Sequence, residues 1–85
     1  MDSVNKFLDS NGLVNVWPKK QADKEQVTFY LATKFKFNHA YHELEINEIL
    51  KRWHTFNDWS LLRRELYERG YFDRNRSGTD YRRLK

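Results

Sequence analysis

The chain has 85 residues, of which 16 are Lys or Arg, 12 are Asp or Glu and none is Cys. A chain of this length forms one small domain whose core is only just large enough. The lack of cysteine excludes disulfides and thiolate metal sites and is typical of intracellular proteins. Residues 1–12 do not resemble a signal peptide, and no apolar stretch approaches the length of a membrane helix. We therefore expect a cytoplasmic domain with no membrane partner.

The first twenty residues predict a small helix followed by an arm. Residues 3–10 place apolar side chains on one helical face, and Asn11-Gly12 ends the pattern. The stretch LVNVW at residues 13–17 favours an extended conformation and stops at Pro18, which predicts a short edge strand or an extended arm.

Two further helices are predicted in the middle of the chain. One covers residues 22–35, with Val27 and Leu31 facing inward. The other follows a turn at residues 38–39 and carries the strongest helical stripe in the chain, formed by Ile46, Ile49, Leu50 and Trp53. His42 occupies its apparent N-cap, where Ser or Thr would complete a capping box with Glu45. We expect this helix start to be weak.

The segment NDWSLLRRELYERG, residues 57–70, predicts a helix over 58–69. Asn57 or Asp58 caps it, and Gly70 closes it with a positive φ. At 100° per residue the leucines fall on the buried side. The opposite side carries Ser60, Arg63, Arg64 and Tyr67.

The last fifteen residues predict a cationic β-hairpin. YFDR and TDYRR are strand-like runs, and Gly78 permits the turn between them. This segment carries five Lys or Arg against two Asp, so it supplies three of the four net positive charges.

Helices followed by a hairpin indicate an α+β, mostly helical, winged helix-turn-helix-like domain. We expect a single domain over residues 1–85, with an N-terminal helix and arm at 1–20 and a winged-helix-like core at 21–85. In this plan helix 58–69 enters a DNA major groove and the hairpin 71–83 is the wing. The candidate nucleic-acid-binding residues are Ser60, Arg63, Arg64, Tyr67, Arg74, Arg76, Arg82, Arg83, Lys19 and Lys20.

Other readings of these residues stay open. The arginine face can equally be a solvated helix surface, and Glu65 and Glu68 weaken its attraction for phosphate. The only possible metal set is His39, His42 and His54, and it does not lie on one helix face. With no nucleophile motif and no phosphate-binding loop, we expect no catalytic residues, no metal and no cofactor.

Four blocks of the sequence resemble a small prokaryotic family of unknown function. They are WPKK at 17–20, YHELEINEILKRWH at 41–54, LLRRELYERGYFDR at 61–74 and GTDY at 78–81. The resemblance covers about residues 7–81 and departs at His42, where the family pattern usually has Thr or Ser. Members occur in hypothetical proteins and attached to transcriptional regulators, so the resemblance implies a DNA-linked role without implying any activity.

Together these features predict a non-enzymatic DNA-binding or transcription-associated module. The alternative is a protein-interaction module of the same fold that docks a regulator or associates with itself. The expected partner is duplex DNA or a protein regulator rather than a small-molecule substrate, and the expected state is a monomer or a weak homodimer.

Overall fold

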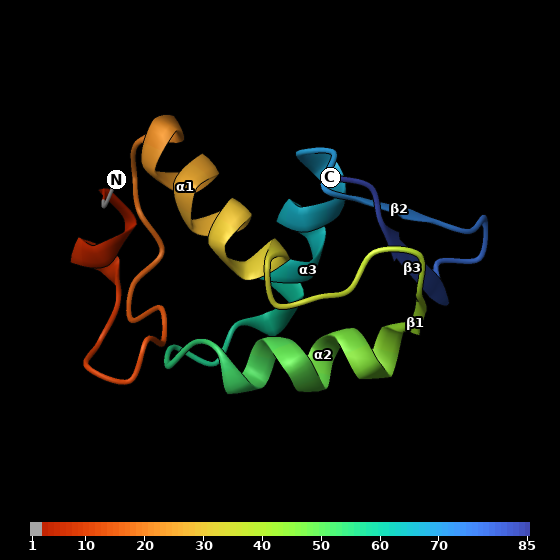
Figure 1. Ribbon diagram of the computed structural model, residues 1–85, viewed down its shortest axis with the longest axis horizontal. Coiled ribbons are helices and arrows are strands. Elements are labelled where there is room, and N and C mark those ends of the chain that lie inside the picture. Colours follow the sequence, from red (N-terminus) through yellow and green to blue (C-terminus); the bar gives the residue numbers. More distant parts are fainter. Residues whose placement is uncertain (1–2) are drawn as a thin grey trace.

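The computed structural model describes residues 3–85. Within this range the chain forms three α-helices, one short 3-10 helix and three strands (Figure 1). In chain order the elements are η1 (Ser3–Phe7), α1 (Gln21–Ala32), β1 (Ala40–His42), α2 (Glu43–Arg52), α3 (Trp59–Glu68), β2 (Phe72–Arg74) and β3 (Asp80–Arg83). The architecture is α+β and winged-helix-like, as predicted, and the β2–β3 hairpin projects from one end of the helical body (Figure 1). None of the helices in residues 3–85 is long and apolar enough to cross a membrane.

The sheet contains a strand that the sequence did not predict. Its order is β1-β3-β2, and both pairings are antiparallel, so β3 is the central strand. β1 places Tyr41 opposite Tyr81 and buries only that one side chain of its three. Residues 40–41 were expected to lead directly into a helix. A three-residue strand shows too little alternation to be recognised without its partner, which lies forty residues away.

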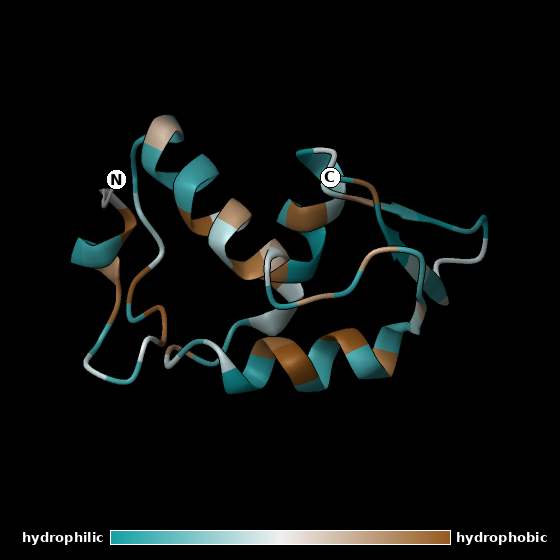
Figure 2. Cartoon of the chain, in the orientation of Figure 1, coloured by the Kyte–Doolittle hydropathy of each residue, from teal (hydrophilic) through white to brown (hydrophobic). Residues whose placement is uncertain are grey.

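The core lies where the three α-helices meet the inner face of the sheet. Brown, apolar segments gather in the middle of the molecule, whereas the hairpin strands are mostly teal (Figure 2). The largest fully buried aliphatic and aromatic side chains are Val14, Val27, Leu31, Ile46, Leu50, Leu62, Leu66 and Phe72. Ile49 and Trp53 were expected in this set but are only half-buried. Trp53 lies at the rim of the core, where the Lys34 ammonium sits 4.0 Å from its ring centroid.

The N-terminal segment is less helical than predicted. The helix expected over residues 3–10 is a 3-10 helix that ends at Phe7. Asp9 causes the early end, because its Oδ1 accepts the backbone N–H groups of Asn11 and Leu13, each at 2.9 Å, and turns the chain. The following residues form an arm rather than a strand, in which Val14 makes isolated bridges to Leu8 and His54.

Two helix ends differ from the sequence prediction. α1 ends at Ala32 instead of residue 35, and the Thr33 hydroxyl donates to the Tyr30 carbonyl at 2.5 Å in the turn that follows. α2 begins with a complete capping box, so the expected weak start is wrong. The His42 Nδ1 accepts the Leu44 N–H at 3.1 Å, and the Glu45 Oε1 accepts the His42 N–H at 2.8 Å. An imidazole nitrogen therefore replaces the usual hydroxyl oxygen as the capping acceptor.

Candidate nucleic-acid interface

The exposed face of α3 has the orientation that the sequence predicted. Asp58 caps the helix by accepting the Leu61 N–H at 3.3 Å, and Gly70 follows it with a φ of 82°. Leu62 and Leu66 are each 1% exposed, which fixes the rotation of the helix about its axis. Ser60 and Arg64 consequently face solvent on the opposite side.

Arg63 does not share the solvent exposure of Arg64. Its Nη1 donates to the Asn47 Oδ1 at 2.5 Å, and its Nη2 lies 3.7 Å from the Glu43 Oε2. These contacts tie α3 to α2 and leave the Arg63 side chain 21% exposed. The expectation that both arginines point freely away from the body is therefore wrong for Arg63. Glu43 and Asn47 lie one turn apart on α2, and this spacing was the only sequence signal for the contact.

A hollow of about 340 Å³ lies between the start of α3 and the hairpin. Its lining comes from both elements and consists of Asp58, Ser60, Leu61, Arg63, Arg64, Arg74 and Tyr81. Arg74 reaches back from β2, and its guanidinium carbon lies 4.0 Å above the ring centroid of Tyr67 on α3. The fold thus brings four of the predicted contact residues into one hollow, and places a fifth, Tyr67, beneath Arg74. The four are Ser60, Arg63, Arg64 and Arg74.

The other hairpin arginines have different environments. Arg76 and Arg82 are exposed, and Arg82 stands opposite Asp73 in the β2–β3 register. Arg83 is half-buried, because its Nη1 donates to the Phe35 carbonyl at 2.8 Å and its guanidinium stacks 3.9 Å from the Phe37 ring centroid. Arg83 therefore anchors the sheet to the loop after α1 and presents little charge to a partner.

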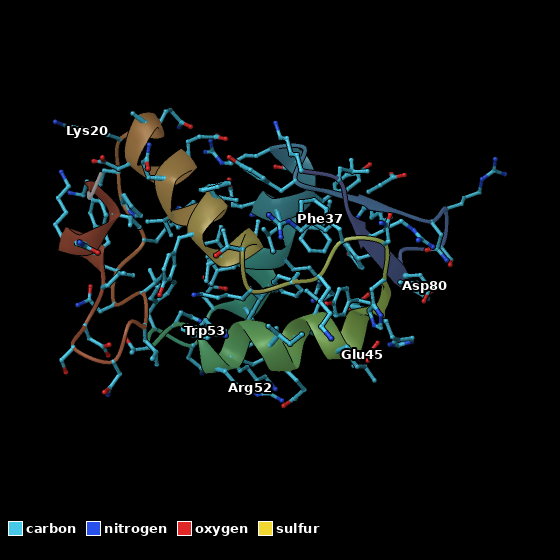
Figure 3. The ribbon with its side chains drawn as sticks, viewed as in Figure 1. Lys20, Phe37, Glu45, Arg52, Trp53 and Asp80 are labelled. Atoms are coloured by element: carbon cyan, nitrogen blue, oxygen red, sulfur yellow. The ribbon has the colours of Figure 1, made fainter. Side chains whose placement is uncertain are left out.

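The two predicted lysines are separated from this surface. Lys19 and Lys20 are exposed and immediately precede α1. Lys20 lies at the opposite end of the molecule from Asp80, which marks the hairpin (Figure 3). The molecule extends 35 Å along its longest axis, so these lysines cannot join the hollow between α3 and the hairpin.

The model of one bacterial protein family matches residues 14–83. The chain belongs to this family. It is described as "Uncharacterized protein conserved in bacteria" (DUF2087), which confirms the resemblance to a small prokaryotic family of unknown function. The matched DUF2087 region includes α1 to β3 and every candidate contact residue, and it leaves η1 outside. No curated protein and no solved structure matches the chain.

This member of DUF2087 also contains a charged cluster that sequence reasoning found only in part. The spacing of Glu65 and Arg69, four residues apart, indicates a pair, and it is present with 2.6 Å between Arg69 Nε and Glu65 Oε1. The same guanidinium donates to the Glu25 Oε1 at 3.1 Å and to the Gln21 Oε1 at 2.8 Å, and the Tyr71 hydroxyl donates to the second oxygen of Glu25. The cluster joins the first half of α1 to the end of α3.

The cluster shifts the pKa values of its members. Burial, together with the hydrogen bond to Glu25, raises the pKa of Tyr71 to about 12. The same hydrogen bond lowers the pKa of the Glu25 carboxyl, and Arg69 lowers it further. The shifts agree in sign, because a protonated phenol and an ionised carboxylate stabilise each other.

Two of the three histidines bond to backbone groups, and the third packs on an aromatic ring. His54 is buried, its Nδ1 lies 2.6 Å from the Leu50 carbonyl oxygen, and its Nε2 accepts the Asp58 N–H at 2.9 Å. His42 caps α2, and His39 packs 4.3 Å from the ring of Tyr41. Residues 3–85 contain no group of three or more His, Asp or Glu side chains arranged to hold a metal ion.

Proposed function

We propose that this domain is a non-enzymatic, transcription-associated module that binds duplex DNA in the bacterial cytoplasm. α3 lies in or near the major groove as the recognition helix, and the β2–β3 hairpin follows the backbone as a basic wing. This role requires cations on the exposed side of α3 and on the hairpin, with nothing between them that blocks a duplex.

The observation that carries the proposal is the convergence of exposed arginines from two elements on one side of the molecule. Arg64 on α3 and Arg74 on β2 line the same hollow, and the exposed Arg76 lies at the turn of the hairpin. Two nearby carboxylates already accept hydrogen bonds from backbone N–H groups. Asp58 caps α3, and Asp73 accepts the backbone N–H of Arg74 at 2.9 Å. A concentrated positive field of this kind attracts phosphates.

The contacts of the titratable groups favour binding over catalysis. Tyr71, Glu25 and Arg69 satisfy one another in a cluster that joins two helices. His54 uses both ring nitrogens on backbone groups. A catalytic acid or base needs a free position facing a substrate, and these groups are already engaged.

A duplex titration at two salt concentrations tests the proposal. We expect binding that weakens steeply with salt, because each arginine that neutralises a phosphate releases a condensed counterion. The Arg76→Ala substitution should lower the slope of log affinity against log salt by about 1. Arg52→Ala is the matched control, because Arg52 is exposed on the outer side of α2 (Figure 3) and should leave the slope unchanged. Absence of duplex binding at low salt would refute the DNA role.

A protein-docking role is the second candidate, and the outer face of α2 favours it. Leu44 is 65% exposed there and lines an open groove of about 330 Å³ with Glu45, Glu48, Ile49 and Arg52. A regulator that docks on this face, or a second copy of the chain, would cover Leu44. Under this alternative, Leu44→Ser should abolish the association in sedimentation experiments, whereas Arg76→Ala should leave it intact.

A further inference from the structure

The side chains that line the hollow between α3 and the hairpin carry more positive than negative charge. Three arginines and one acid line it, so the formal charge of the lining is +2. Glu43 offsets Arg63 from outside the hollow. Within residues 3–85 the structure shows no ion pair for Arg64 or Arg74. Two guanidinium groups without an ion pair beside one hollow favour the entry of an anion.

Two of the three guanidinium groups are held in place before any ligand binds. Asn47 and Glu43 fix Arg63 from the α2 side, and the ring of Tyr67 supports Arg74 from below at 4.0 Å. A fixed guanidinium loses little side-chain entropy when it binds, and its planar fork matches the oxygens of a phosphate. Arg64 is the exposed third member, and the Ser60 hydroxyl adds a neutral donor.

The charge of the hollow selects its ligand. Its volume of about 340 Å³ leaves room for a phosphate group. A guanine edge offers two acceptors but no charge, so it would not offset the net positive charge of the lining. A phosphate group offers several acceptors together with the negative charge that the lining lacks.

We propose that this hollow binds one phosphate group, and that Arg64 contacts this phosphate rather than a base edge. The source is a backbone phosphate of duplex DNA or a free phosphate. The assignment to DNA rests on the proposed function, whereas the phosphate site itself rests only on the lining of the hollow. An exposed arginine on a recognition helix commonly reads a guanine edge. The proposal instead gives Arg64 the role of fixing the position of α3 on the duplex.

A phosphate titration followed by NMR tests the site without DNA. The probe is inorganic phosphate, with sodium chloride at matched ionic strength as the reference. We expect saturable shifts of the Ser60 amide and the Arg64 side chain with phosphate only. Arg64→Gln and Arg74→Gln should each weaken binding about tenfold, as expected for loss of a charge-assisted contact, and Arg52→Gln should not. Equal shifts with chloride, no saturation, or unchanged affinity in both hollow variants would overturn the site.

A DNA titration then distinguishes a backbone phosphate of DNA from a free phosphate as the ligand. It also distinguishes a phosphate contact of Arg64 from a base contact. We expect Arg64→Gln to weaken binding equally on duplexes of different sequence and to lower the salt slope by about 1. A loss confined to one preferred sequence would show that Arg64 reads a base, and the proposed contact would be wrong. If phosphate saturates the hollow but no duplex binds at low salt, the site stands with free phosphate as its ligand and the DNA function fails. Unchanged thermal unfolding of each variant excludes a folding defect.

Discussion

Ionisation of Tyr71 should weaken the fold at alkaline pH. The pKa of Tyr71 is about 12 in the folded protein, against an ordinary value of 10.0. Between these values the unfolded chain loses the phenolic proton while the folded chain keeps it, so folding stability falls as pH rises. Each pKa unit is worth about 1.4 kcal/mol, which gives a loss of about 2–3 kcal/mol across this interval. Below pH 10 the contribution is fully present.

Removal of the hydroxyl isolates this contribution. At neutral pH Tyr71→Phe should cost about 1.5–3 kcal/mol, because the hydroxyl donates to the charged carboxylate of Glu25. The difference in stability between wild type and variant should then shrink as pH rises from 10 to 12. At acid pH Glu25 has the opposite effect, because its contribution to folding stability is lost as pH falls. Its pKa is lowered, so its contribution is present above its ordinary value of 4.5 and is lost as pH falls below it.

Urea unfolding at a series of pH values measures both effects. Tyr67→Phe is the matched control, because Tyr67 is half-buried and its ring supports Arg74, a contact that phenylalanine can preserve. The control should follow wild type through the alkaline range. A Tyr71→Phe variant that loses stability between pH 10 and 12 as steeply as wild type would show that Tyr71 does not carry the shift.

Substitutions at three further positions test the packing and the helix starts. Leu66→Ala should cost about 2–5 kcal/mol in urea unfolding, because Leu66 is 1% exposed, and a cost below about 1 kcal/mol would contradict the helix phase. His42→Ala should cost about 1 kcal/mol and His42→Ser should restore most of it, because a hydroxyl can replace the capping imidazole; equal losses would exclude this cap. His54→Leu should destabilise by about 1–3 kcal/mol, since it leaves the Asp58 N–H without its partner and removes one of the groups that bond the Leu50 carbonyl, which keeps the Trp53 N–H; wild-type stability in the variant would refute this role.

Much of the architecture follows from patterns within short stretches of the chain. The stripe in residues 46–53 and the leucines of α3 indicated two helices and the buried face of each, because a helix repeats every 3.6 residues whatever surrounds it. The cap at Asp58, the helix end at Gly70 and the turn at Gly78 could also be recognised in the sequence, because caps and turns depend on residues that are close in the chain. The exposure of Ser60 and Arg64 followed directly from the helix phase.

The remaining features depend on contacts between distant residues, and only the tertiary structure decided them. β1 exists because Tyr41 pairs with Tyr81, and the stretch around residue 40 carries no pattern of its own. Asn47 holds Arg63 from sixteen residues away, and Glu25 holds Arg69 from forty-four residues away. Periodicity could orient each arginine relative to its own helix. Whether a guanidinium is free or hydrogen-bonded depends on the element that packs beside it. The tertiary packing decides which element that is, and the periodicity of a single helix does not show it.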